Sequence, residues 1–487
     1  MQEKAENSIL RYAIYLIALV SLVYCFFAFP NITYQKPFSD DWMMLEVGRG
    51  LHNKSLVEWL SVKDDFNQWR PMPYIFTGIY LKGETCDLAL YNTFKLFIFI
   101  GIIMLTYFTS TLFLKDRQVA ALSALFFLLN PTNIGAVQNI DHVYKLTGTL
   151  FYGITMVSLY LYFKQEKQET KYIIICFISY IISFFSDADA VAIFPAICLL
   201  TILNIRNRKM SIRKSAIIIG TSLLILVFYL YLRSIIVGGA FSGGLSGKQD
   251  IVLSFNILYN SLKLLISSLI FTVSPYIYFK KPAYIAFGAF FMILNVSVIF
   301  FAIFKSSNEQ RGKLFLLLCL SLIGMIPFVF IRHVSEIYSF RPSYLLMIIL
   351  AYSYMFLYGT VDKKLKNIII ISFVLVLIFG AYSLKVKQDM MLKRGLMAEE
   401  MANSMMQVVP TPLPFSTINL LVNDCGVKDT YSDFINNDIQ LAGIIKFFVR
   451  YNYNDKTLNS IDKPQNVYNL EWNCDKKKFY LLSQKVK

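Results

Sequence analysis

Long apolar stretches separated by short polar segments run through most of the chain, and this alternation restricts it to a membrane-spanning fold. A helix needs about 20 mostly apolar residues to cross the hydrocarbon core of a bilayer. Of the 487 residues, 56% are hydrophobic and 16% are charged, and the mean hydropathy is +0.53. We therefore predict an all-α polytopic membrane protein with about 11 transmembrane helices, some of them short. The candidate spans are residues 9–29, 90–114, 119–129, 146–163, 172–185, 191–203, 216–237, 284–304, 314–331, 344–358 and 368–384.

The basic residues of the short loops predict the orientation. Residues 9–29 are too long for a typical signal-peptide core and lack a small-residue cleavage site, so we expect an uncleaved anchor. Most of the net charge of +16 lies in residues 1–384, and the densest basic cluster, residues 204–214, is typical of a cytoplasmic loop. A cytoplasmic N-terminus follows, provided that residues 251–271 form an interfacial or re-entrant helix. We expect a multi-pass protein of a membrane such as the bacterial cytoplasmic membrane.

The composition changes near residue 384. Residues 1–384 form the predicted membrane domain, with extracytoplasmic loops at 30–89 and 238–283. Residues 385–487 are predicted to form a small extracytoplasmic α/β domain. Its expected elements are a charged helix at 385–406, strands at 417–422, 447–453, 467–472 and 479–482, and a helix near 438–445. Cys425 and Cys474 lie in this domain, where a disulfide between them and two free thiols are both open alternatives.

Several classes of function are not expected. No tract interleaves basic and aromatic residues, and there is no Gly-rich phosphate loop, so nucleic acid is not an expected partner. The seven cysteines form no CxxC or Cys/His cluster, which argues against a zinc site. Charged and histidine side chains collect on the predicted outer side, where nucleotide sugars and ATP are absent, so an activated donor would have to arrive attached to lipid. These residues are Asp40, Asp41, His52, Arg70, His142, Lys145, Asp187, Asp189, Arg332, His333, Glu336 and Arg341.

Two adjacent carboxylates follow the first span. Asp40 and Asp41, in Ser39-Asp40-Asp41-Trp42, come shortly after the helix-breaking Pro30 and are expected just outside the membrane. Adjacent carboxylates repel, so one can hold its proton at a raised pKa or share a cation, and such a group suits general-base chemistry. The alternative is that Ser39 or Asp40 caps a solvated helix that starts at Trp42. The residues alone leave both interpretations open.

Five stretches occur in the order found in the GT-C glycosyltransferases, multi-pass enzymes that use polyprenyl-phosphate sugars. The chain most resembles the O-mannosyltransferases that carry tetratricopeptide repeats, and their bacterial relatives. The resemblance covers most of residues 9–360. The matching stretches are Ser39-Asp40-Asp41-Trp42, Trp69-Arg70-Pro71-Met72, Asn130-Pro131 through Phe151, the segment from Leu264 to Pro275, and Glu336-Ile337-Tyr338-Ser339-Phe340-Arg341-Pro342-Ser343.

The resemblance implies a reaction and roles for these residues. A sugar would pass from a polyprenyl-phosphate donor to an extracytoplasmic glycan, lipid or protein, with inversion at the anomeric carbon. Asp40 would be the base and Asp41 its orienting or metal-sharing partner. Arg70 and Arg341 would grip the donor phosphate, because a guanidinium matches its oxygens bidentately, with Lys145 as a further cation. The alternative for each arginine is snorkelling or pairing with a carboxylate such as Glu336. The remaining cavity-lining candidates are Trp69, His142, Asp189 and Glu336.

The chain also departs from that family. Val143-Tyr144-Lys145 replaces its Arg-x-Asp, Asp187-Ala188-Asp189 replaces its Ser-Lys-Glu, and the tetratricopeptide repeats are missing. The resemblance therefore names neither the sugar nor the acceptor. Asp40, Asp41 and Asp189 are candidates for a divalent cation such as Mg²⁺ or Mn²⁺, although their spacing does not demand one.

Two rival functions fit the same class of fold. A polysaccharide polymerase or ligase would use a diphosphate-linked glycan, but such an enzyme does not need the acidic pair after the first span. A transporter or flippase would carry charged residues at mid-membrane and paired helical repeats. The charged residues of this chain lie toward the ends of the predicted spans. The sequence therefore favours the glycosyltransferase.

Overall fold

The computed structural model describes most of the membrane domain and part of the C-terminal region. The described residues are 30–37, 41–51, 54–63, 68–80, 88–165, 169–206, 210–239, 256–269, 282–330, 336–410, 416–422, 466–473, 476 and 478–486. The predicted first span at 9–29, Asp40, Cys425, Cys474, the strand at 447–453 and the helix at 438–445 lie outside them.

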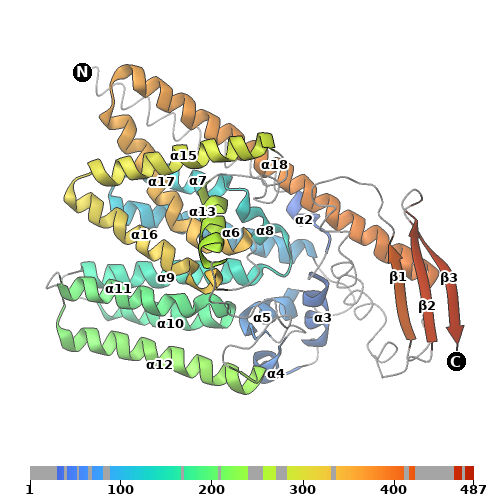
Figure 1. The fold of residues 1–487 in the computed structure, drawn as a ribbon. Helices are drawn as coiled ribbons and strands as arrows, with labels where there is room; N and C mark the ends of the chain where they lie inside the picture. The colour runs from blue at the N-terminus through green and yellow to red at the C-terminus, as the bar shows by residue number, and fades with distance from the viewer. Residues whose placement is uncertain are drawn as a thin grey trace.

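Helices dominate the described part of the chain (Figure 1). Each of the ten candidate spans from residue 90 onward coincides with a helix, as expected of apolar runs whose backbone groups must bond internally. The short helices are α2 (Pro30–Thr33), α3 (Asp41–Leu51), α4 (Leu56–Ser61), α5 (Pro71–Tyr80), α8 (Thr132–Gln138), η1 (Ala188–Ala192) and η2 (Glu336–Ser339). The longer ones are α6 (Leu88–Leu114), α7 (Arg117–Leu129), α9 (Val143–Lys164), α10 (Thr170–Ser186), α11 (Ile193–Arg206), α12 (Ile212–Val237), α13 (Asn256–Leu269), α15 (Pro282–Lys305), α16 (Asn308–Val329), α17 (Phe340–Thr360) and α18 (Lys363–Val408).

Eight described helices are long and apolar enough to cross a membrane, or nine if the bent pair of α7 and α8 counts as one span. The two members of that pair meet at 67°, and α10 is a shorter apolar helix. The predicted count of about 11 therefore includes one span outside the described residues and one helix, α10, that falls short of full length. The prediction of an all-α membrane domain is confirmed.

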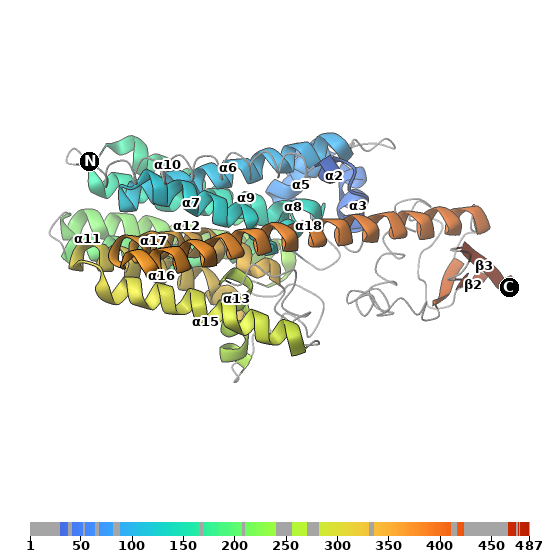
Figure 2. The same cartoon turned by 90° about the horizontal axis from the view of Figure 1, so that it is seen from above.

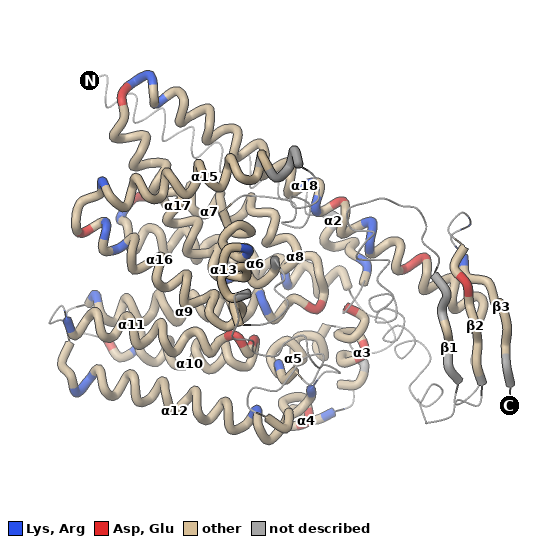
Figure 3. Tube along the Cα trace, viewed as in Figure 1, with Lys and Arg blue, Asp and Glu red and all other residues tan. Residues whose placement is uncertain are grey.

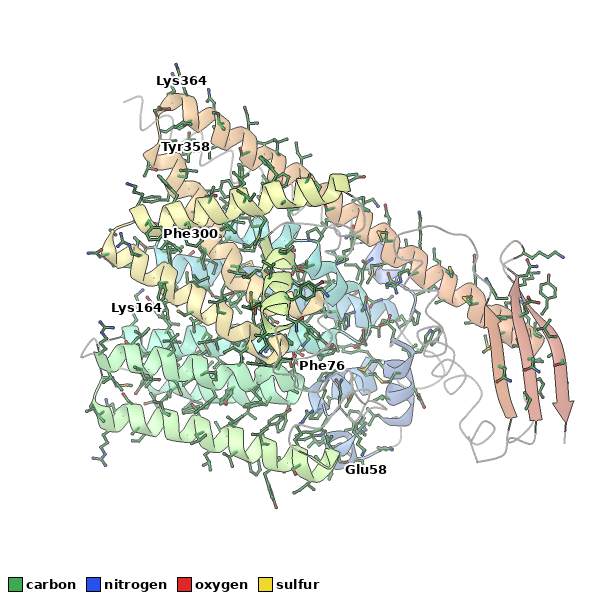
Figure 4. All side chains as sticks on the ribbon, in the orientation of Figure 1. Glu58, Phe76, Lys164, Phe300, Tyr358 and Lys364 are labelled. Carbon is green, nitrogen blue, oxygen red and sulfur yellow. The ribbon has the colours of Figure 1, made fainter. Side chains whose placement is uncertain are left out.

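The connections between helices sort to two ends of the bundle. The turns from α11 to α12, α15 to α16 and α17 to α18 lie at the left of Figure 1, while α3, α4 and α5 lie at the right. The labelled side chains agree: Lys164 and Lys364 lie toward the left of the view and Glu58 toward the right (Figure 4). The loops predicted to be cytoplasmic thus share one end of the bundle. That this end faces the cytoplasm remains a prediction.

Apolar side chains cover the outer faces of the helices. On α12 the exposed residues include Ile217, Leu224, Phe228 and Tyr231, which suits a helix surrounded by lipid. Buried positions in the bundle are taken by large aromatics and by small hydroxyl side chains that bond the carbonyl one turn earlier, as Thr106 does to Ile102. The helices therefore pack through their interiors and expose apolar surface outward.

Helix α18 connects the membrane bundle to a three-stranded sheet. At 46 residues it is about 70 Å long, and it runs out of the bundle toward the strands (Figure 2). The division near residue 384 falls inside this continuous helix, and the predicted charged helix at 385–406 is its outer half. Lys385 and Asp389 form an i,i+4 pair of 2.6 Å that favours continuing the helix across the charged turn.

The sheet has the order β1-β2-β3, with β1 (Ser416–Val422), β2 (Asn466–Asn473) and β3 (Lys478–Val486). β1 pairs in parallel with β2, and β2 pairs antiparallel with β3. Three of the four predicted strands are therefore confirmed, and the fourth lies outside the described residues. The backbone N–H of Phe479 donates to Ser404 Oγ at 2.7 Å, which fastens the sheet to α18.

The segment after α2 packs against the C-terminal half of α18. Lys36 and Glu399 form an ion pair of 2.8 Å, and Gln35 Nε2 donates to the carbonyl of Met391 at 3.3 Å. Gly395 lies between these contacts, and a Cβ atom there would stand 2.6 Å from the carbonyl oxygen of Lys36. A glycine is thus required where the two backbones cross.

Replacing Gly395 by alanine is expected to destabilise the protein. The added Cβ would force the 35–37 segment away from α18, at a cost of about 1–3 kcal/mol. A Cβ atom added at Gly359 in α17 would meet nothing within 4 Å, so Gly359→Ala is a matched control that is expected to be neutral or slightly stabilising. Thermal unfolding in detergent micelles measures both. Equal unfolding temperatures for the two variants would contradict the close crossing.

Candidate active site

The predicted site residues meet where α3, α5, η1 and η2 surround the start of α9. Residues 139–142 form a turn between α8 and α9; the backbone N–H of Asp141 in this turn donates to Asp41, and the carbonyl of His142 accepts from the backbone N–H of Lys145. Charged residues also mark this region in Figure 3, away from the group at the left ends of the helices. Because the surrounding helices are apolar, each charge here needs a partner or a ligand.

Asp41 is the first residue of α3 and is completely buried. Its Oδ1 accepts a hydrogen bond of 3.0 Å from the backbone N–H of Asp141, far away in the sequence. The carboxylate therefore ties the start of α3 to the turn before α9. The alternative of a solvated helix start does not fit Asp41, while Ser39 and Asp40 lie outside the described residues.

Lys95 is a site residue that the sequence analysis missed. It lies inside α6, is completely buried, and its ammonium group donates to the carbonyl of Asn139. The carboxylates of Asp41 and Asp141 both act on it electrostatically. One turn earlier, Tyr91 donates to the carbonyl of Ile140 at 3.1 Å. A lysine within an apolar span was the signal that could have identified it.

A second cluster joins Lys145, Asp187, Asp189 and Arg341. Lys145 Nζ lies 3.0 Å from Asp187 Oδ2 and also binds the carboxylate of Asp189. One terminal nitrogen of Arg341 lies 3.0 Å from Asp187 Oδ2, and the other donates to the carbonyl of Asp189 at 2.8 Å. Arg341 thus pairs with Asp187, which is the N-cap residue of η1. From the sequence, Glu336 was given as an example of such a carboxylate partner.

A glycine allows this cluster to close. Gly148 on α9 faces it, and a Cβ atom at this position would stand 2.9 Å from Asp187 Cβ and 3.1 Å from an Arg341 nitrogen. Its carbonyl accepts from Ser183 at 3.1 Å, which holds the end of α10 against α9. The close contact of α9, α10 and the start of α17 therefore depends on a residue without a side chain.

Asp187 is the central acid of the cluster. Burial alone would raise the pKa of its carboxyl, but Lys145 and Arg341 outweigh this effect and hold the pKa below its ordinary value. From the sequence, Asp189 was expected to take the acidic role; its side chain is 23% exposed, whereas that of Asp187 is 2% exposed. Asp187 was therefore missed as a site residue although it lay in the same motif.

Trp69 and Arg70 lie beside this cluster at the start of α5. Arg70 stacks its guanidinium 3.6 Å from the centre of the Tyr144 ring, and it acts electrostatically on Asp187. Trp69 is buried, stacks on Tyr229 at 5.7 Å, and donates through Nε1 to the carbonyl of Leu60 at 2.6 Å. Trp69 is thus a packing residue that fixes the position from which Arg70 extends.

The other predicted residues take less direct parts. Nδ1 of His142 lies 3.0 Å from the carbonyl of Gly135, and Nε2 lies 3.4 Å from Asp141 Oδ2, longer than a charge-assisted hydrogen bond. Burial lowers the pKa of His142 to about 4, so the ring is neutral at pH 7 and serves as a structural link. Glu336 begins η2, and its side chain lies outside what the structure describes.

The described residues contain no group of three or more His, Cys, Asp or Glu placed to hold a metal ion. Asp41 and Asp189 bind different partners, the Asp141 N–H and the Lys145 ammonium. Of the three acids suggested for a divalent cation, Asp40 lies outside the described residues. A metal site is therefore still a prediction.

The comparison with known proteins concerns the fold. No family model matches the chain, and no curated protein matches it. Two solved structures match almost all of it: ArnT from Cupriavidus metallidurans bound to undecaprenyl phosphate, with a TM-score of 0.53, and the same protein in the apo state, with 0.51. The chain has the ArnT fold. Sequence identity to ArnT is 12%, and the first match covers 94% of this chain and 92% of ArnT. The predicted fold class, a helical multi-pass membrane protein with a small C-terminal part that contains strands, is confirmed by this likeness to ArnT.

Proposed function

We propose that the protein is a membrane glycosyltransferase that moves a sugar, in our hypothesis a hexose, from a polyprenyl-phosphate donor to an extracytoplasmic glycan, lipid or protein. The observation that carries the proposal is the meeting of a buried carboxylate centre at Asp41 with the Arg70–Lys145–Arg341 cations at one end of an ArnT-like bundle. Sugar transfer from a lipid phosphate needs both a base for the acceptor and cations for the leaving group.

The acceptor hydroxyl would lose its proton to Asp40. Its oxygen would form a bond to the anomeric carbon while the bond from that carbon to the phosphate oxygen breaks, and the phosphate would leave with the electron pair. This single displacement inverts the anomeric carbon. Asp41, the next residue, is anchored to the turn before α9 and would fix the position of the base. A phosphate leaving group is a weak base, so it needs cations and no proton donor.

Three cationic side chains gather at the second cluster and beside it. Lys145 and Arg341 belong to the cluster with Asp187 and Asp189, and Arg70 lies beside it, so these cations would face the negative charge of a phosphodiester. Arg341 Nε is buried and has no hydrogen-bond partner among the described residues, so it offers a donor to the phosphate. The site thus fits a polyprenyl phosphate, the kind of lipid to which ArnT is bound in one of the matching structures.

A transfer assay tests the proposal. Membranes with and without the protein receive undecaprenyl phosphate carrying labelled glucose, mannose or galactose, and the label is followed from lipid to glycan or protein. We expect label to leave one donor with release of undecaprenyl phosphate, only where the protein is present. Intact labelled lipid moving across the bilayer, with no cleavage of any donor, would favour a flippase instead.

A further inference from the structure

Buried carboxamide groups without partners surround the turn between α8 and α9. On α6, both amide atoms of Asn92 lack a hydrogen-bond partner, and on α18 both amide atoms of Gln388 do. Gln138 Oε1 and Asn139 Oδ1, at the end of α8, are also buried without a hydrogen-bond partner. The side chains of Asn92, Gln138 and Gln388 are all completely buried, and the unpartnered amide atoms have no hydrogen-bond partner among the described residues.

The contacts of the neighbouring atoms bring these amides to one place. Gln138 Nε2 donates to the backbone carbonyl of Gln388 at 3.3 Å, so the end of α8 and this turn of α18 touch. Asn92 shares a helical face with Tyr91 and Lys95, which bond the carbonyls of the 139–140 turn. The three elements therefore converge on the residues that also hold Asp41.

Leaving a buried amide unbonded is costly, because the group gives up its bonds to water and gains nothing in return. Gln138 offers an acceptor and Gln388 a donor on facing elements, yet their side chains do not bond each other. For Asn92 and Gln388 both atoms are unpartnered, so exchanging the oxygen and nitrogen of the amide changes nothing. Unused donors and unused acceptors thus occur together on elements that pack around the 139–140 turn.

That mixture suits a ligand whose polar groups both donate and accept. A phosphate or carboxylate can only accept, and an ammonium group can only donate, whereas a hydroxyl does both. We propose that the carboxamides of Asn92, Gln138, Asn139 and Gln388 bind hydroxyl groups of the sugar carried by the lipid donor. The inference rests on the proposed function, because it takes the ligand of this site to be a lipid-linked sugar. The amides would hold the sugar beside the carboxylate centre while the cationic cluster holds its phosphate.

The test uses Gln388→Met in the full-length protein in detergent micelles. The substitution keeps the length of the side chain and removes an amide that makes no described hydrogen bond, so the unfolding temperature without ligand is expected not to fall. Two probes are compared: undecaprenyl phosphate, and undecaprenyl phosphate carrying glucose, mannose or galactose. The wild-type protein is expected to bind one hexosyl lipid more tightly than the sugar-free lipid. Gln388→Met is expected to lose about tenfold in affinity for that hexosyl lipid and to bind the sugar-free lipid unchanged.

A matched control is Gln310→Met at the start of α16, at the other end of the bundle. Its Oε1 atom is also buried without a described partner, and its replacement is expected to leave both affinities unchanged. The sugar site would be overturned if wild type and Gln388→Met bound the hexosyl lipid with equal affinity, or if wild type did not prefer it to the sugar-free lipid. Either result would leave the lipid-phosphate function intact. Failure of the wild-type protein to bind any of the lipids would instead overturn the proposed function, and this inference with it.

Discussion

Asp40→Asn is expected to lower kcat for sugar transfer by roughly 10²- to 10⁴-fold, the usual contribution of a general base. The amide keeps the shape of the side chain but cannot take the proton of the acceptor hydroxyl. Binding of the lipid donor is expected to persist, because the cations that face the phosphate are untouched. A transfer assay and a donor-binding assay on the same preparation measure the two effects separately.

The neighbouring acid gives a contrasting variant. An asparagine at position 41 can still accept the N–H of Asp141 through its amide oxygen, so Asp41→Asn is expected to lose less activity than Asp40→Asn. Asp389→Asn on the exposed part of α18 serves as a charge-loss control and is expected to be fully active. Full activity of the Asp40→Asn, Asp41→Asn double variant, in stable inserted protein, would rule out the base assignment.

Asp187→Asn is expected to lower the free energy of unfolding by about 3–5 kcal/mol, because it leaves the buried cations of Lys145 and Arg341 with one carboxylate fewer. Adding Arg341→Met to that variant is expected to recover part of the loss, since the methionine is similar in length and needs no charged partner. Unfolding in denaturant, measured for both single variants and the double variant, gives the coupling. Strictly additive losses would contradict a direct pair.

The pH dependence of the free energy of unfolding supplies a second test of the pairing of Asp187 with Arg341. The pKa of Asp187 is lowered in the folded protein, so its stabilising effect is present above the ordinary carboxyl pKa and is lost as the pH falls below it. The stability difference between wild type and Asp187→Asn is therefore expected to shrink below about pH 4. The exposed Lys385–Asp389 pair is the control, because exposed pairs contribute about 0–1 kcal/mol and Asp389→Asn should change little at any pH.

The helices were predictable because crossing a bilayer requires long apolar runs, and each such run from residue 90 onward is helical. The sequence predicted a span at 368–384 and a charged helix at 385–406, but we placed a domain boundary between them, because the charged turn after residue 384 is typical of a span end; α18 is one continuous helix across it. There the pairing of Lys385 with Asp389, and the docking of the 35–37 segment on Gly395, continue the helix beyond the apolar part. Neither contact can be recognised from hydropathy.

The site was predictable in its members more than in their partners. Lys145, Asp189 and Arg341 do come together, but their bonds are to one another and to Asp187. These pairings link residues roughly 40 to 150 positions apart and depend on how α9, α10 and α17 pack around Gly148. Lys95 was hidden within an apolar run. Such partners follow from tertiary packing, which a single sequence does not specify.

The central proposal is that a sugar leaves a lipid phosphate for an acceptor outside the membrane. Mass spectrometry of envelope glycans, from cells with the gene, without it, and with the gene carrying Asp40→Asn, tests this claim directly. We expect one specific sugar to be missing when the gene is absent, to return with the wild-type gene, and to stay missing with Asp40→Asn. Identical glycans in all three strains, or full restoration by Asp40→Asn, would contradict the account.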